Sequence, residues 1–136
     1  MPTSRVVEVA AALLERDGCI LLAQRPAGTH LAGFWEFPGG KREAGETFEA
    51  CLARELLEEV GVEVEVRGEA RRVRHAYPDR TVEIRFFRCR LVRGEPRALQ
   101  VAAVAWVPRA ELGRYPVPPA DREVVEWLSA AAEPVT

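Results

Sequence analysis

The chain has 136 residues, with 19 Lys and Arg residues against 21 Asp and Glu residues and a formal net charge of −2. This length suits one domain with its own hydrophobic core. The charge provides no overall basic field, which argues against a nucleic-acid polymer as partner. No apolar run reaches membrane-spanning length, and the N-terminus lacks the pattern of a signal peptide, so we expect a cytoplasmic protein with no membrane partner. Three widely spaced cysteines fit reduced thiols in that compartment.

The first half of the chain is typical of strands followed by a helix. Apolar runs on either side of Arg16-Asp17-Gly18 predict a hairpin with strands over residues 6–15 and 19–23. Residues 34–37 form a short extended segment, which the Pro38-Gly39-Gly40 sequence is expected to break sharply. From Thr47 onward the apolar residues recur at helical spacing, and Gly61 suits the C-terminal end of that helix.

The second half adds further strands and a final helix. Alternating apolar residues predict strands over residues 62–66 and 81–91, with a turn at 77–80, and another strand over 101–107. A short helical segment is expected after Pro108, followed by a helix from Asp121 to about residue 131, which Asp121 can cap. This mixture predicts an α+β fold in which a mixed sheet lies between helices.

The segment from Gly40 to Val62 indicates the chemistry. A glycine loop opens into the predicted helix, and helical residues three and four apart share one face, so Glu55, Glu58 and Glu59 are expected to project together. Carboxylates this close repel one another unless a cation lies among them. Mg²⁺ is the natural candidate, because it takes oxygen ligands and bridges carboxylates to substrate phosphates. The competing interpretation is a solvated acidic face with ion pairs along the helix.

The same segment resembles the Nudix box. Its fixed positions are matched by Gly40, Glu46, Arg54, Glu55, Leu56, Glu58, Glu59, Gly61 and Val62. The resemblance covers nearly the whole chain and implies a single Nudix hydrolase domain over residues 1–136, with the Nudix fold. Residues 37–41, 77–80 and 119–121 resemble the MutT-like branch, whereas residues 24–26 and 115–116 resemble bacterial CTP pyrophosphohydrolases.

The resemblance also implies an activity and a set of site residues. MutT-like members convert a nucleoside triphosphate to monophosphate and pyrophosphate with Mg²⁺, for which Mn²⁺ can substitute, so a small nucleotide is the expected partner. The implied metal ligands are the Gly39 carbonyl, Glu55, Glu58 and Glu59, with Glu55 either a ligand or the general base. Arg54 and Glu46 complete the catalytic group by orienting these carboxylates. The implied phosphate-binding residues are Arg25 and Lys41, and the implied base-binding residues are Phe37, Tyr77, Arg80 and Asp121.

Several alternatives stay open at this point. Oxidised guanine, as in 8-oxo-dGTP, is the first substrate hypothesis. An ionised Asp121 only accepts hydrogen bonds, which suits either the amine of dCTP or 5-methyl-dCTP or an N–H of guanine. Gln100 stands where many relatives carry a Glu, which leaves a non-catalytic nucleotide-binding module as a further hypothesis unless Glu36 or Glu95 compensates. His30 and His75 are expected to be surface or structural residues, with His75 nearer the base pocket. The chain is expected to be a monomer or a homodimer.

Overall fold

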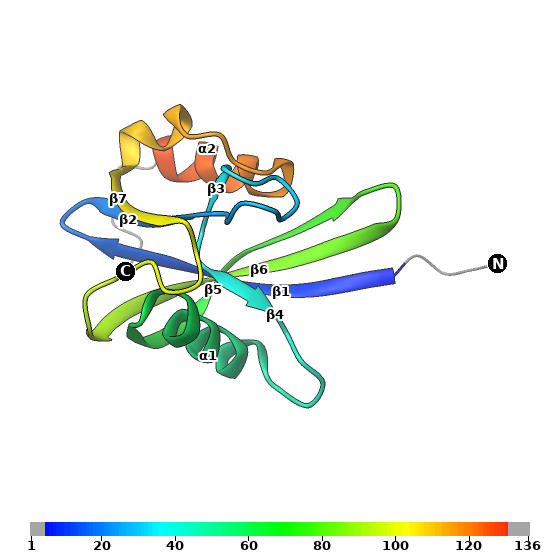
Figure 1. Cartoon of the computed structure of the whole chain (residues 1–136), viewed down its shortest axis with the longest axis horizontal. Coiled ribbons are helices and arrows are strands. Elements are labelled where there is room, and N and C mark those ends of the chain that lie inside the picture. Colours follow the sequence, from blue (N-terminus) through cyan, green and yellow to red (C-terminus); the bar gives the residue numbers. More distant parts are fainter. Residues whose placement is uncertain (1–4, 131–136) are drawn as a thin grey trace.

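The structure is a computed structural model that describes residues 5–130. These residues form a seven-stranded mixed sheet with one α-helix on each face (Figure 1). The predicted α+β architecture is therefore confirmed. The expected end of the last helix, at about residue 131, lies outside the described residues. Within the described part, no helix is long and apolar enough to span a membrane.

The elements follow one another along the chain as strands, one helix, more strands and a helical C-terminal region. The strands are β1 (Arg5–Arg16), β2 (Cys19–Gln24), β3 (Trp35–Glu36), β4 (Gly39–Lys41), β5 (Glu63–Ala76), β6 (Arg80–Arg93) and β7 (Ala103–Pro108). The helices are α1 (Phe48–Val60) and α2 (Arg122–Ala130), with 3₁₀ helices η1 (Arg109–Arg114) and η2 (Pro119–Asp121) before α2.

Strand β1 organises the sheet. The main order is β3-β2-β1-β6-β5, while β4 pairs with β1 and β7 pairs with β2. Strands β1 and β6 run parallel from the pair Arg5 and Arg80 to the pair Leu14 and Cys89, and the other pairings are antiparallel. Strands β1, β5 and β6 extend beyond the helices as a long arm (Figure 1). The inner part of this arm provides one wall of the cavity described below.

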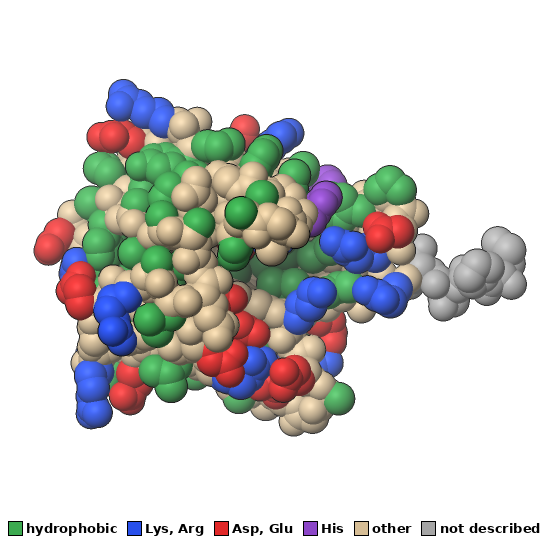
Figure 2. Space-filling model, viewed as in Figure 1, with side chains coloured by type: hydrophobic (Ala, Val, Ile, Leu, Met, Phe, Trp, Pro, Cys, Tyr) green, Lys and Arg blue, Asp and Glu red, His purple; other side chains and the backbone are tan. Residues whose placement is uncertain are grey.

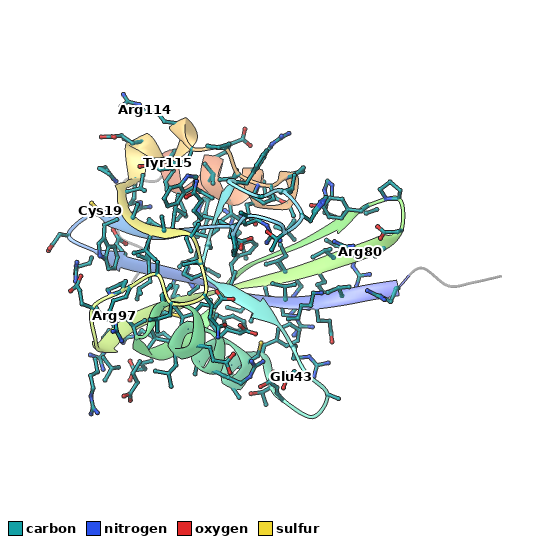
Figure 3. The ribbon with its side chains drawn as sticks, in the orientation of Figure 1. Cys19, Glu43, Arg80, Arg97, Arg114 and Tyr115 are labelled. Atoms are coloured by element: carbon teal, nitrogen blue, oxygen red, sulfur yellow. The ribbon has the colours of Figure 1, made fainter. Side chains whose placement is uncertain are left out.

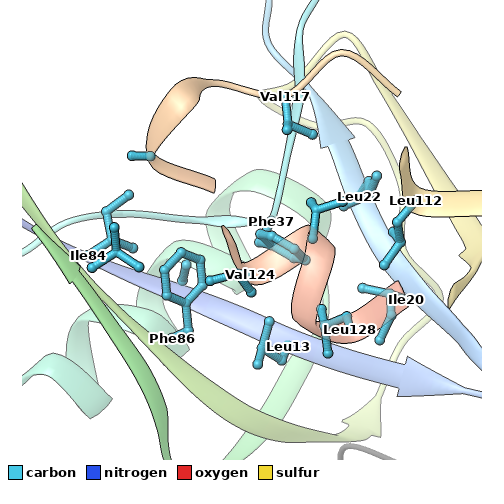
Figure 4. Close-up of a cluster of buried hydrophobic side chains, with 14 of the residues drawn as sticks. Leu13, Ile20, Leu22, Phe37, Ile84, Phe86, Leu112, Val117, Val124 and Leu128 are labelled. Atoms are coloured by element: carbon cyan, nitrogen blue, oxygen red, sulfur yellow. The ribbon is translucent and has the colours of Figure 1, made fainter. Parts of the chain in front are cut away.

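Alternation along β1 divides the core into two layers. Ala10, Ala12 and Leu14 pack in one buried cluster with the apolar face of α1. Leu13 and Ala11 belong to the other cluster, which contains α2 residues (Figure 4). Because neighbouring residues of a strand point to opposite faces, one strand fixes the positions of both helices.

Helix α1 begins and ends as its sequence predicts. Thr47 is the N-cap, and its hydroxyl accepts a hydrogen bond of 3.0 Å from the Ala50 backbone N–H. Gly61 is the C-cap in the left-handed region, at φ 73°, where glycine carries no steric penalty. These caps fix the register of the helix, and therefore which acidic residues face the sheet.

One prediction about the segments around α1 and α2 is wrong. Gly39 and Gly40 do not break the chain but form strand β4, which pairs with Val9, Ala10 and Ala11 of β1. A Cβ on Gly39 would lie 2.0 Å from the Ala10 carbonyl oxygen, so the two backbones approach at a distance that only glycine allows. The short helical segment expected after Pro108 is confirmed as the 3₁₀ helix η1, and a second 3₁₀ helix, ending at Asp121, precedes α2.

Candidate active site

A cavity of about 500 Å³ opens beside the diglycine strand, between the sheet and the segments that precede α2. Its floor is apolar and comes from Val7 and Val9 of β1 and Val82 and Ile84 of β6. Polar side chains surround this floor: Arg25, His30, Glu36, Lys41, Glu55, Glu59, Tyr77, Arg80 and Asp121. In the space-filling view, acidic side chains gather beside the hollow in the middle of the molecule (Figure 2). The cavity therefore combines an apolar floor with a charged rim.

Glu55 and Glu59 bring two carboxylates to the wall next to β4. They lie one turn apart on α1, and a Cβ on Gly40 would lie 2.5 Å from Glu55 Oε2, so the diglycine strand is in direct contact with Glu55. Burial, followed by the charge of Glu55 and a hydrogen bond with it, raises the pKa of Glu59 to about 8. A backbone hydrogen bond from Gly39 opposes this shift. The pKa of Glu59 is therefore raised first by burial of its carboxylate and then by repulsion from Glu55.

Arg54 links the acidic residues of the box. Its Nε and Nη2 donate to the two carboxylate oxygens of Glu46 at 2.9 and 2.7 Å, and its Nη1 donates to Glu55 at 3.2 Å. Together with the Glu43 backbone N–H, this arrangement lowers the pKa of Glu46 to about 2. Arg54 and Glu46 thus form a pair of parallel hydrogen bonds. A guanidinium held in this way offers its remaining N–H groups in a fixed direction.

Glu58 lies beside Glu55 but outside the cavity wall, because Arg54 Nη1 donates hydrogen bonds to both carboxylates, at 3.2 and 3.3 Å. It is absent from the cavity wall, its side chain is 46% exposed, and it accepts a hydrogen bond of 3.3 Å from Arg54. Glu59 lies about 40° around the helix from Glu55, whereas Glu58 lies about 60° away on the other side. Arg54 therefore holds Glu58 on the outer flank. Among residues 5–130, no three His, Cys, Asp or Glu side chains are grouped so that they could hold a metal ion.

The two predicted phosphate-binding residues both line the cavity but differ in their surroundings. Arg25 Nη1 donates to both oxygens of Glu36, at 3.0 and 3.1 Å, and Arg25 Nε donates to the His30 carbonyl at 2.6 Å. Lys41 lies at the end of β4 and is exposed. Arg25 therefore neutralises a neighbouring carboxylate and fixes the loop that carries His30, while Lys41 is the more accessible cation.

The four predicted base-binding residues also line the cavity. Phe37 is buried and packs edge-on against Phe86 at 5.6 Å between ring centroids, so it belongs to the core as well as to the wall (Figure 4). Arg80 lies at the start of β6, near the tip of the long arm, and its Nη1 is 3.2 Å from Asp79 Oδ2 (Figure 3). Tyr77 precedes it in the turn, and Asp121 is 5% exposed at the end of η2.

Some cavity residues were missed or misjudged from the sequence. The aliphatic floor was missed, although alternation in residues 81–91 was the signal that could have located half of it. His30, not His75, lines the cavity, whereas His75 packs on Tyr77 with 4.6 Å between the ring centroids. Of the two carboxylates considered as compensation for Gln100, Glu36 lies on the wall and Glu95 forms an ion pair with Arg16 instead.

The dependence of stability on pH tests whether the Asp121 carboxyl is buried as described. Burial, and then the negative charge of Glu36, raises the pKa of Asp121 well above its ordinary value, and Arg25 acts in the opposite direction. The folded protein thus holds this proton to a higher pH than the unfolded chain does. The stability contributed by the protonated carboxyl is complete at low pH and is lost as the pH rises through the raised pKa.

Asp121→Asn is therefore expected to raise the free energy of unfolding at about pH 8, because the wild-type carboxyl, ionised in the unfolded chain, must either take up a proton or carry its charge into the protein on folding. The gain should shrink as the pH is lowered to about 4, where both chains are neutral at this position. Urea unfolding at the two pH values measures the difference. A constant difference between the variant and the wild type would contradict the burial of this carboxyl.

The fold and the cavity together define a class of protein. It is an α+β protein in which acidic residues of α1 and the diglycine strand β4 line a cavity with an apolar floor. A protein-family model described as NUDIX domain matches residues 9–127. The chain belongs to this family, which confirms the resemblance of residues 40–62 to the Nudix box.

Individual relatives cover almost the whole chain. The chain is 39% identical over 132 residues to the CTP pyrophosphohydrolase of Escherichia coli strain K12, spanning 96% of this chain and 98% of that protein. It is 35% identical over 126 residues to the 8-oxo-dGTP diphosphatase of Haemophilus influenzae, spanning 91% and 92%. The solution structure of the E. coli ORF135 protein matches with a TM-score of 0.81 at 37% identity, covering 98% of this chain and 96% of that one.

Proposed function

We propose that this protein is a divalent-metal-dependent nucleoside triphosphate diphosphatase, which releases a nucleoside monophosphate and pyrophosphate and takes 8-oxo-dGTP as its main substrate. The observation that carries the proposal is the cavity itself. Glu55 and Glu59 line the same cavity as the apolar floor and the buried Asp121. A nucleotide needs both kinds of surface, one for its phosphates and one for its base. The names of the relatives support the same reaction class.

The donor set suits Mg²⁺, with Mn²⁺ as a substitute. Glu55, Glu59 and the Gly39 carbonyl offer only oxygen atoms, which hard divalent cations prefer. Burial and the charge of Glu55 raise the pKa of Glu59 to about 8, which supports a site where a proton or a cation offsets the buried charge. Glu58 would extend this ligand set from the flank of the helix. When bound, the metal neutralises charge on the phosphate oxygens and acidifies a water molecule.

Side chains of the protein would orient the carboxylates, accept a proton and neutralise phosphate charge. Arg54, held by Glu46, keeps the Glu55 carboxylate in place through a hydrogen bond of 3.2 Å. Whichever of Glu55 and Glu59 is not a ligand can accept the proton of the attacking water, which makes it the general base. Lys41 and Arg25 offset the negative charge of the phosphates from the cavity wall.

Base recognition falls to the other side of the cavity. The aliphatic floor and the rings of Phe37 and Tyr77 offer apolar surface to a flat base. The raised pKa of Asp121 widens the pH range in which its carboxyl is protonated. A protonated carboxyl both donates and accepts hydrogen bonds, whereas an ionised one only accepts. The edge of a guanine offers both kinds of partner, which favours 8-oxo-dGTP.

A CTP or dCTP pyrophosphohydrolase is the second candidate. The E. coli relative with that name is similar along 98% of its own length, and an ionised Asp121 would accept a hydrogen bond from the cytosine amine.

A cytoplasmic location is supported by the free thiols of Cys19, Cys51 and Cys89.

The substrate is tested by measuring pyrophosphate release from 8-oxo-dGTP, dGTP, dCTP and 5-methyl-dCTP with Mg²⁺. The proposal predicts the highest kcat/KM for 8-oxo-dGTP, by about tenfold over dGTP. A tenfold preference for the cytosine nucleotides would make the second candidate correct. Nucleotide binding without hydrolysis of any of the four would show a binding module in place of an enzyme.

A further inference from the structure

Loop 42–47 joins β4 to α1 and carries Glu46, the residue that holds Arg54. Glu43 marks this loop beside the start of α1 (Figure 3). We propose that Arg42 is a positioning residue for the Glu55 and Glu59 carboxylates and acts on them through this loop. The link to catalysis rests on the proposed function, but the structural part of the inference can be measured without it.

Arg42 ties the loop to strand β1 by both its backbone and its side chain. Its backbone N–H donates to the Glu8 carbonyl at 2.9 Å. Its Nε and Nη2 both donate to Glu8 Oε1, the former at 3.1 Å. The two side chains are only 28% and 32% exposed, so the ion pair is partly shielded from solvent. Glu8 lies in the part of β1 that pairs with β6, so the anchor is on the central sheet.

The third arm of the guanidinium reaches the loop itself. Arg42 Nη1 donates to the carbonyl of Glu46 at 2.8 Å. The carboxylate of the same Glu46 accepts the two hydrogen bonds from Arg54. Arg42 thus holds the backbone of Glu46, and the Glu46 carboxylate in turn holds Arg54. Fixing the Glu46 backbone fixes the position from which Arg54 is oriented.

Arg42 also lies against the beginning of α1. Its Cζ is 5.2 Å from the ring centroid of Phe48, the first residue of the helix, and Arg85 lies over the same ring at 3.9 Å. Phe48 is buried. The guanidinium therefore contacts three parts at once: the sheet, the loop and the N-terminal end of the helix that carries Glu55 and Glu59.

These contacts form one continuous series of charged groups. It runs from Glu8 through Arg42 to Glu46, then through Arg54 to Glu55 at the cavity wall. Arg42 does not line the cavity. It is expected to act only by holding the groups that do, in the way that outer residues orient metal ligands.

The test compares Arg42→Met with a matched control, Arg72→Met. Arg72 also donates two hydrogen bonds to one carboxylate, that of Glu69 at 2.7 and 2.9 Å, but it lies on β5 and, among residues 5–130, donates to no residue of loop 42–47. The first measurement is the ¹⁵N NMR signal of the Arg54 Nε–H group, which needs neither metal nor nucleotide. Arg42→Met is expected to shift and broaden this signal, and Arg72→Met is expected to leave it unchanged.

The second measurement is Mn²⁺ affinity by electron paramagnetic resonance, and the third is kcat and KM. Arg42→Met is expected to weaken Mn²⁺ binding and to lower kcat by about tenfold to hundredfold, with KM changed less than threefold. Arg42→Lys, which keeps one charged donor, should recover part of both losses.

An unchanged Arg54 signal with unchanged Mn²⁺ affinity in Arg42→Met would overturn the inference. If Arg42→Met does not fold, the same measurements are made on Glu8→Gln. This substitution keeps the size of the Glu8 side chain but removes the negative charge that pairs with Arg42. A wild-type protein that hydrolyses none of the four nucleotides, but shows the expected NMR shift, would refute the proposed function and leave the positioning role of Arg42 standing.

Discussion

Glu59→Gln is expected to lower kcat by about a thousandfold while the protein stays folded. The substitution keeps the size of the side chain but removes a carboxylate that faces the cavity beside Glu55. A neutral amide attracts a divalent cation far less than a carboxylate does, and it cannot accept a proton from water. The amide also removes the buried charge and its repulsion from Glu55, the two main causes of the raised pKa of Glu59, so thermal stability without metal is expected to be equal or higher.

The matched control for this experiment is Glu49→Gln on the same helix. Glu49 lies in the first turn of α1, is exposed and is absent from the cavity wall. Its removal should leave kcat within about twofold of the wild type and cost only a few tenths of a kcal/mol through the helix dipole. Equal activities of Glu59→Gln and the wild type would show that this carboxylate takes no part in the reaction.

Gly40→Ala is expected to remove most of the activity without unfolding the protein. The added Cβ would lie 2.3 Å from Glu55 Cδ, so the carboxylate has to move. Because the clashing group is the end of a flexible side chain, the backbone can stay in place. Displacing Glu55 from Arg54 and from the cavity wall should reduce kcat about a hundredfold.

The neighbouring glycine should behave in the opposite way. A Cβ on Gly39 would lie 2.0 Å from the Ala10 backbone oxygen, which cannot move without separating β4 from β1. Gly39→Ala is expected to cost about 3 kcal/mol of stability, seen as a lower urea midpoint. Gly68→Ala, with nothing within 4 Å of the new methyl group, is the control for both variants. A stable, fully active Gly40→Ala protein would contradict the contact between β4 and Glu55.

The acidic helix could be read from the sequence because its signals are local. Thr47 and Gly61 set its ends, and the apolar residues Cys51, Leu52 and Leu56 set its buried face. With 3.6 residues per turn, the positions of Arg54 and Glu55 follow. The contact between Arg54 and Glu46 also spans only eight residues. For these reasons the helix and its arginine were predicted correctly.

The remaining features depend on contacts between distant segments. Gly39 and Gly40 form a strand because β1 lies beside them, which turn propensity does not reveal. Arg25 meets Glu36 because β2 pairs with β3, and the cavity floor exists because β1 and β6 run parallel. Glu58 lies on the outer flank of the group of carboxylates because Arg54, which Glu46 holds, donates a hydrogen bond of 3.3 Å to it.

Binding of Mn²⁺ at the Glu55 and Glu59 pair tests the central claim most directly. Electron paramagnetic resonance can count the ions bound by the wild type and by a Glu55→Gln, Glu59→Gln double variant at the same protein concentration. The account predicts saturable binding by the wild type that the double variant loses, with nucleotide increasing the affinity of the wild type only. Equal Mn²⁺ binding by both proteins, or none by the wild type with nucleotide present, would contradict it.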